Sequence, residues 1–130
     1  MIAIDTNILV RLFANDDPIQ SPRTAQLFAE QDVFVSKTVM LETEWVLRFS
    51  YALSRTTIAA AVGKLLSTST VTVEGAEAVQ AAIAAYESGM DFADALHLSS
   101  SASAERFLTF DRKLARAALR AKSALSVQVA

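Results

Sequence analysis

The first thirteen residues, Met1–Phe13, read MIAIDTNILVRLF and contain the pattern that decides the fold. The apolar run MIAI stops at Asp5, which is followed by the polar residues Thr6 and Asn7. Such a run is typical of a buried strand that ends at a turn or at a functional edge, and a helix is expected over residues 7–14. A strand followed by a helix is the repeating unit of parallel α/β proteins, so we expect an α/β fold.

The same alternation continues through the rest of the chain. Further strands are predicted at 33–35, 70–73, 106–110 and 125–129, and further helices at 21–31, 38–50, 54–69, 75–89, 91–104 and 111–122. Ser21 and Pro22 are predicted to begin the second helix as N-cap and first helical residue, and Gly89 to end the fifth. The Ser-rich stretch SSSASA resembles low complexity, but we favour a helix packed closely against the sheet. We expect one domain over residues 1–130, with a mainly parallel sheet of four to five strands and about seven helices.

The composition excludes several classes of protein. The chain has 130 residues, 52% of them hydrophobic, and no cysteine, so neither a disulfide framework nor a thiolate metal site is possible. This suits a reducing cytoplasm. Asp5 and Arg11 interrupt the N-terminal apolar run, so no signal peptide is expected, and no run approaches the roughly 18 apolar residues of a membrane span. The net charge of −2 means that a nucleic-acid site would have to be a local basic patch.

Two aspartates directly follow predicted strands. Ligands of open parallel sheets bind beyond the carboxyl ends of the strands, which is where Asp5 and Asp111 are expected. If the first and fourth strands are neighbours, the two carboxylates would repel each other unless a cation lies between them. The alternative is that each aspartate only caps the following helix.

The helix at 38–50 contains two glutamates with different expected roles. Glu42 and Glu44 point about 200° apart, since each residue turns a helix by about 100°. Glu44 has Arg48 four residues on, which predicts a solvated surface ion pair. Glu42 shares an apolar stripe, predicted to face inward, with Val39, Trp45, Val46 and Phe49. A carboxylate there needs a compensating cation such as a metal ion, unless it lies at the edge of the stripe and reaches solvent.

The segment MDFADALHL, residues 90–98, supplies the remaining acids. Asp91 is predicted to be the N-cap of a helix. Asp94 lies one turn into the helix, where it either binds a ligand or complements the helix dipole. His97 is the only histidine, and it is expected to be a packed or surface group because no second His or Cys would complete a nitrogen or sulfur site.

Four blocks of the sequence occur in the order MIAIDTNILVRLF, VSKTVMLETEWVLR, DFADALHLSSSA and FLTFD. Together they resemble the PIN-domain family, specifically the VapC-type ribonuclease toxins of bacterial toxin–antitoxin pairs. The resemblance covers the full length and implies a single three-layer α/β/α domain. It also implies an acidic cluster that binds Mg²⁺ or Mn²⁺ and hydrolyses RNA. Carried over by position, the family's acids fall on Asp5, Glu42, Asp94 and Asp111, and its supporting polar residues on Thr6, Asn7 and Thr109.

An all-carboxylate site suits hard octahedral cations such as Mg²⁺ or Mn²⁺ better than Zn²⁺. We expect Asp5 and Asp94 to ligate the metal directly, with Asp91 in support. Asp111 and Glu42 would act through water or on a second ion and orient the attacking water. In-line attack would leave a 5′-phosphate and a 3′-hydroxyl, as the resemblance also implies.

Positive charge for an RNA substrate is concentrated near the C-terminus. Arg112, Arg116 and Arg120 recur every four residues along one helix, with Lys113 beside them. This stripe either binds RNA phosphates or is an ordinary solvated helix face.

The resemblance implies a VapB-type antitoxin as partner. The helices at 38–50 and 54–69 carry more apolar residues than their core stripes need, including Trp45 and Phe49, so we expect part of this surface to form a homodimer interface or an antitoxin groove. Two other functions stay open: a non-catalytic PIN-like binding module, and a related metal-dependent nuclease acting on DNA. An aspartyl phosphatase is disfavoured because Asn7 stands where such enzymes want a second aspartate.

Overall fold

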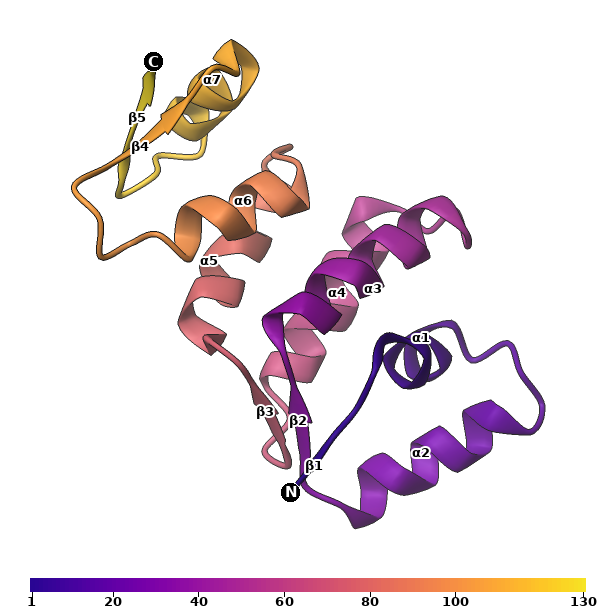
Figure 1. Ribbon diagram of the computed structural model, residues 1–130. Coiled ribbons are helices and arrows are strands. Elements are labelled where there is room, and N and C mark those ends of the chain that lie inside the picture. The colour runs from indigo at the N-terminus through magenta and orange to yellow at the C-terminus, as the bar shows by residue number, and fades with distance from the viewer. The chain divides into compact units, whose positions relative to one another are not determined.

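Three short parallel strands form the first sheet of the computed structural model, which describes residues 1–130 (Figure 1). Strand β1 (Ile2–Ala3) pairs with β2 (Val33–Val35), and β2 pairs with β3 (Val71–Val73), in the order β1-β2-β3. Ile2 is opposite Val33, and Val33 is opposite Val71. Val33 and Val35 are completely buried, as is usual for a parallel strand covered on both faces.

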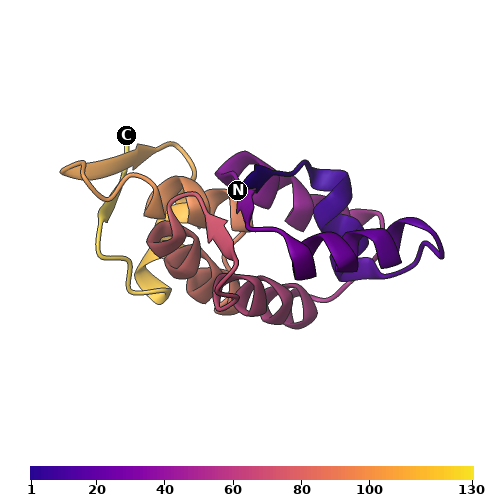
Figure 2. The same cartoon turned by 90° about the horizontal axis from the view of Figure 1, so that it is seen from below.

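The chain divides into two compact units, Met1–Ala76 and Glu77–Ala130, which are described separately. The first unit also contains helices α1 (Thr6–Ala14), α2 (Gln20–Glu30), α3 (Lys37–Phe49) and α4 (Arg55–Leu66). Helix α1 packs against α2 and α3, and α3 lies beside α4 (Figures 1 and 2). The core of this unit is built from apolar side chains of the strands and helices, including Leu9, Val35, Met40, Leu47, Ile58 and Val62.

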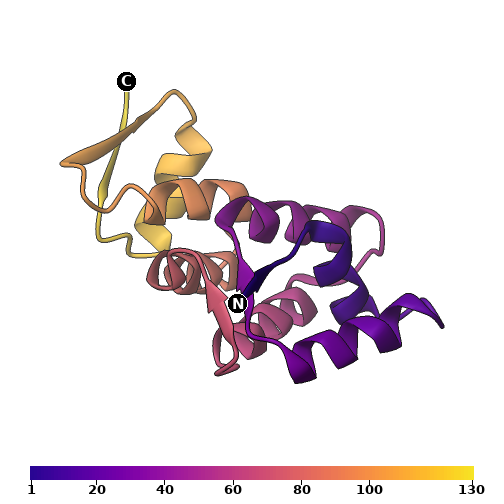
Figure 3. The same ribbon diagram turned by 60° about the horizontal axis from the view of Figure 1, so that its bottom comes forward.

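The second unit contains helices α5 (Ala76–Glu87), α6 (Phe92–Ser99) and α7 (Arg112–Arg120) and strands β4 (Arg106–Thr109) and β5 (Ser126–Val129). The two strands pair in parallel, and α7 lies against them (Figure 3). The rings of Tyr86 on α5 and Phe92 on α6 meet edge to face with centroids 5.5 Å apart, and both are completely buried. This aromatic pair anchors the core of the unit.

The expected α/β fold, with seven helices and parallel strand pairing, is confirmed. The strand arrangement differs in one respect from the expectation of one sheet of four to five strands. Five strands occur, but they form a three-stranded sheet and a two-stranded sheet. Strand β1 is only two residues long and therefore offers few backbone groups for pairing. The predicted stop of the fifth helix is confirmed, since α5 ends at Glu87 and Gly89 adopts a left-handed φ of 111°.

The prediction that Ser21 caps the second helix was wrong. Helix α2 begins at Gln20, and the carboxylate of Asp17 accepts hydrogen bonds from the backbone N–H groups of Ile19 at 2.9 Å and Gln20 at 2.6 Å. The bond from Gln20, and then that from Ile19, lower the pKa of Asp17 below its ordinary value. An aspartate four residues before Ser21 therefore stabilises the start of this helix instead.

The prediction of a helix through SSSASA was also wrong. Helix α6 ends at Ser99, residues 100–103 form turns, and residue 104 forms a bend. The hydroxyl of Ser101 donates to the carbonyl of His97 at 2.8 Å, and that of Ser99 donates to the carbonyl of Leu96 at 3.3 Å. The Ser101 hydroxyl thus occupies the carbonyl that its own backbone N–H would bond in a longer helix, and that N–H bonds to Leu98 instead.

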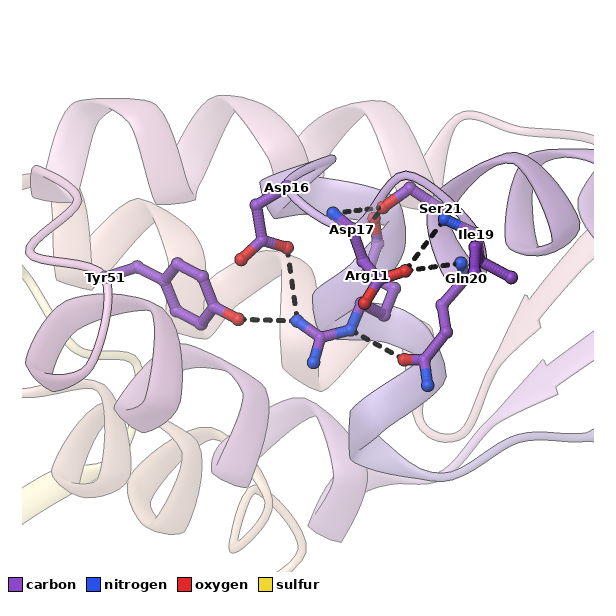
Figure 4. Close-up of polar contacts among 7 residues, drawn as sticks. All are labelled: Arg11, Asp16, Asp17, Ile19, Gln20, Ser21 and Tyr51. Carbon is purple, nitrogen blue, oxygen red and sulfur yellow. Dashed lines mark hydrogen bonds and ion pairs between the residues drawn. The ribbon is translucent and has the colours of Figure 1, made fainter.

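Arg11 connects three segments of the first unit (Figure 4). Its guanidinium donates to the hydroxyl of Tyr51 at 2.7 Å, to Asp16 at 3.1 Å and to Gln20 at 2.9 Å. The bond to Tyr51 is the main reason that the pKa of Arg11 is raised above its ordinary value. The network holds the α1–α2 loop, visible as a projecting purple loop in Figures 2 and 3, against the segment that follows α3.

Candidate functional site

Asp5 lies two residues beyond the end of β1 and is the N-cap of α1. One of its carboxylate oxygens, Oδ1, accepts a hydrogen bond from the backbone N–H of Ile8 at 3.3 Å. The residue is exposed, and its Oδ2 has no hydrogen bond. The capping role expected as an alternative is therefore present, and it leaves one oxygen available for a ligand.

Thr6 links the start of α1 to Glu42 on α3. Its hydroxyl donates a hydrogen bond to Oε1 of Glu42, and the threonine itself is buried. Because Thr6 follows Asp5 directly, this bond fixes the carboxylate of Glu42 near the carboxyl end of β1. Asn7, the second predicted supporting residue, is exposed on the first turn of α1.

The prediction of which side of α3 is buried was wrong. The buried residues of this helix are Met40, Thr43, Glu44 and Leu47, whereas Trp45 is 56% and Phe49 59% exposed. Glu42 is exposed, and Glu44, predicted to be solvated, is only 3% exposed. The expected pair with Arg48 explains how Glu44 is buried, because the guanidinium contacts both of its oxygens, at 2.7 and 3.3 Å.

Asp91 and Asp94 lie together at the start of α6 in the second unit. Asp91 is the N-cap, as predicted, and its carboxylate accepts from the backbone N–H of Asp94 at 3.1 Å. Asp94 is partly buried in the first turn. Burial, and then the negative charges of Asp91 and Asp111, raise the pKa of Asp94 above its ordinary value, with His97 opposing the shift. The Asp94 carboxylate is therefore crowded by other acids, a situation that a bound cation relieves.

Asp111 caps α7 two residues beyond the end of β4. Its Oδ1 accepts from the backbone N–H groups of Lys113 at 2.9 Å and Leu114 at 3.2 Å. Its own N–H donates to the hydroxyl of Thr109 at 3.0 Å, so Thr109 positions the aspartate. The residue is exposed and Oδ2 has no hydrogen bond, which repeats the arrangement at Asp5.

The predicted site residues fall into two groups. Asp5, Thr6, Asn7 and Glu42 belong to the first unit, and Asp91, Asp94, Thr109 and Asp111 to the second. Neither unit alone gathers three or more acidic or histidine side chains with the geometry of a metal site. The donors are all carboxylate, hydroxyl or amide oxygens, which fit a hard divalent cation.

The predicted basic stripe is present on α7. Arg112, Lys113, Arg116 and Arg120 are all exposed, while Leu114 and Ala118 on the opposite side of the helix are buried. His97, the only histidine, is exposed on α6, which is the surface position of the two expected alternatives, packed or surface.

Comparison with known families identified the family of this chain. A family model described as PIN domain matches residues 2–119, a range that includes Asp5, Glu42, Asp94 and Asp111. No curated relative matched the sequence. Among the helices, none combines the length and apolar character needed to cross a membrane.

Proposed function

This chain is a member of the PIN-domain family, whose members are generally metal-dependent nucleases, and from that premise we propose that it is a metal-dependent endoribonuclease and the toxin of a toxin–antitoxin pair. The observation that supports the nuclease chemistry most strongly is the state of two aspartates. Asp5 and Asp111 each follow a strand, each cap the next helix through Oδ1, and each keep Oδ2 available as a ligand.

We assign each acid a role within one PIN domain that spans residues 1–130. Asp5 and Asp94 hold the cation directly, and Asp91 supports Asp94 from the same turn of α6. Glu42 and Asp111 bind through water or to a second ion and accept a proton from the attacking water. Thr6 orients Glu42, and Thr109 orients Asp111, while Asn7 offers an amide at the start of α1.

Magnesium or manganese fits this set, because every donor is an oxygen and the Asp94 carboxylate already experiences the charges of Asp91 and Asp111. Bound there, the cation would acidify water and neutralise charge on the phosphate and on the leaving oxygen. In-line attack by the water breaks the bond between phosphorus and the 3′-oxygen, and leaves a 5′-phosphate and a 3′-hydroxyl.

We propose that the exposed cations of α7 bind the RNA substrate. Arg112, Lys113 and Arg116 follow Asp111 along the same helix, so phosphates bound by this face would lie close to one of the proposed metal ligands. Guanidinium and ammonium groups bind phosphates in any sequence, which positions the strand without selecting bases.

The toxin role implies a VapB-type antitoxin and a homodimer or a larger toxin–antitoxin assembly. Trp45 and Phe49 are exposed neighbours on α3, with ring centroids 5.2 Å apart. Arg48 lies over the Phe49 ring at 4.4 Å. We propose this aromatic surface as part of the protein interface, because exposed aromatic and arginine side chains are enriched at such surfaces.

Cleavage of total RNA tests the proposed activity. We expect cleavage with Mg²⁺ or Mn²⁺, none with EDTA, and none after Asp5→Ala or Asp94→Ala, provided that circular dichroism shows a preserved fold. Leu119→Ala serves as a control because Leu119 is exposed on α7 and has no assigned role. Undiminished cleavage by either aspartate variant would refute the site, and preferential cleavage of DNA would refute the substrate.

A further inference from the structure

Phe110 is the most exposed large apolar side chain of the chain, at 86%, and it stands between Thr109 and Asp111. Its backbone is held on both sides. The carbonyl of Thr109 accepts from the N–H of Ala130 at 2.8 Å, and the N–H of Asp111 donates to the Thr109 hydroxyl at 3.0 Å. An aromatic ring is therefore presented to solvent from a fixed position next to a proposed site residue.

Local folding does not account for the position of this ring. An apolar residue just before an N-cap commonly packs against the fourth residue of the helix as a hydrophobic staple, which here is Ala115. A ring packed in that way would lose much of its exposure, and Phe110 has not. Leu108 on β4 and Val129 on β5 are also exposed, at 54% and 39%, and scattered exposed apolar residues are ordinary. The charged groups near Phe110 must therefore show whether the ring has a use.

Exposed cations follow Phe110 along α7. The first turn of the helix carries Arg112 and Lys113, and Arg116 follows one turn later, beside one acid of the same segment, Asp111. Arg112 and Lys113, the second and third residues after Phe110, are exposed. A flat apolar ring beside exposed cations combines the two features with which proteins bind single-stranded nucleic acid: aromatic stacking on bases and positive charge along the backbone.

We infer that Phe110 is a stacking platform for one unpaired base of the RNA, which it holds while the cations of α7 bind neighbouring phosphates. The inference rests on the proposed function and deepens it, because it makes the substrate single-stranded at the point of cleavage. Bases in a duplex are stacked on each other and cannot lie on the ring. The role of Phe110 is positioning, since no proton or metal ligand comes from its side chain.

Binding of a fluorescein-labelled RNA oligonucleotide tests this role. All proteins carry Asp94→Asn so that cleavage does not interfere. Phe110→Ala is expected to weaken single-strand binding by about 5- to 150-fold, the effect of losing one stacked base, and to leave binding of a duplex of the same length unchanged. Phe110→Tyr should retain single-strand affinity. Leu119→Ala is the matched control, because Leu119 is 80% exposed on the same unit but lies at the far end of α7.

A fluorescence measurement separates stacking from a structural effect. The chain has one tryptophan, Trp45, so the double variant Trp45→Phe and Phe110→Trp carries its only indole at position 110. The inference predicts quenching of this indole by the single strand and none by the duplex. Equal affinity of the Phe110→Ala variant and its parent, or no quenching on binding, would overturn the stacking role and leave the proposed nuclease intact. Failure of both the Asp94→Asn parent and the wild-type protein in EDTA to bind any RNA would overturn both.

Discussion

The hydroxyl of Thr6 donates a hydrogen bond to Oε1 of Glu42, which joins the first residue of α1 to the exposed side of α3. This contact orients the carboxylate, so its loss should reduce activity more than stability. We expect Thr6→Val to lower RNA cleavage by about 10- to 100-fold, as is typical when a group that orients a ligand is removed. Thr6→Ser keeps the hydroxyl and should keep most of the rate; equal rates for Thr6→Val and wild type would contradict the orienting role.

Glu42 and Glu44 provide a matched pair of variants on one helix. Glu44→Gln should lower the free energy of unfolding by about 1–3 kcal/mol, because it weakens a charge-assisted contact of a buried carboxylate with Arg48. Glu42→Gln should change stability little and abolish cleavage. Urea denaturation measures the effect on stability, and an RNA cleavage assay measures the effect on activity. A destabilised but active Glu42→Gln variant would contradict the catalytic role of Glu42.

Asp94 should make the metal-free protein less stable as pH rises. Its pKa in the folded state is raised above the ordinary value of 3.8, so the folded state binds this proton more tightly than the unfolded state. The resulting stabilisation is complete below pH 3.8 and is lost as pH rises through the folded pKa. Asp94→Asn should therefore raise the melting temperature in EDTA by a few degrees near neutral pH, with a smaller gain near pH 4. A variant that melts below wild type at neutral pH would contradict the crowding of Asp94 by Asp91 and Asp111.

The basic face of α7 should determine how RNA binding depends on salt. Each phosphate contact on a single strand contributes about 0.7 to the slope of log affinity against log salt. The double variant Arg112→Gln and Arg116→Gln should therefore lower this slope by about 1.4. Arg23→Gln, an exposed arginine on α2, serves as the control. An unchanged slope in the double variant would mean that this face of α7 does not bind RNA phosphates.

The positions of most elements, and several helix starts, could be predicted from the sequence because they depend on local patterns. The short apolar runs identified the strands, and Asp5, Ser54, Asp91 and Asp111 lie at helix N-caps. The start of α2 was mispredicted because Asp17 bonds two N–H groups ahead of Ser21. Which side chain bonds the first N–H groups of α2 depends on the conformation of the α1–α2 loop. Arg11 holds this loop through a hydrogen bond to Tyr51, forty residues away.

The orientation of α3 could not be predicted because the helix carries two candidate stripes. The stripe of Trp45 and Phe49 is more apolar, yet the buried side contains Thr43 and Glu44. An ion pair four residues apart is normally a surface feature, and only the packed structure shows that Glu44 is buried while its partner Arg48 stays partly exposed. The exposure of Phe110, 86%, could not be predicted either, because it depends on how the end of β4 packs in the folded chain.

Paramagnetic broadening by Mn²⁺ tests most directly the metal-binding role proposed for Asp5, Glu42, Asp94 and Asp111. Substoichiometric Mn²⁺ added to ¹⁵N-labelled protein broadens the amide signals of residues near the ion. We predict broadening at Asp5 and Glu42 together with Asp94 and Asp111, and its loss from all four in Asp94→Asn. Absence of broadening at Asp5 or at Asp94, or broadening around Asp5 that persists in Asp94→Asn, would contradict the proposed set of ligands.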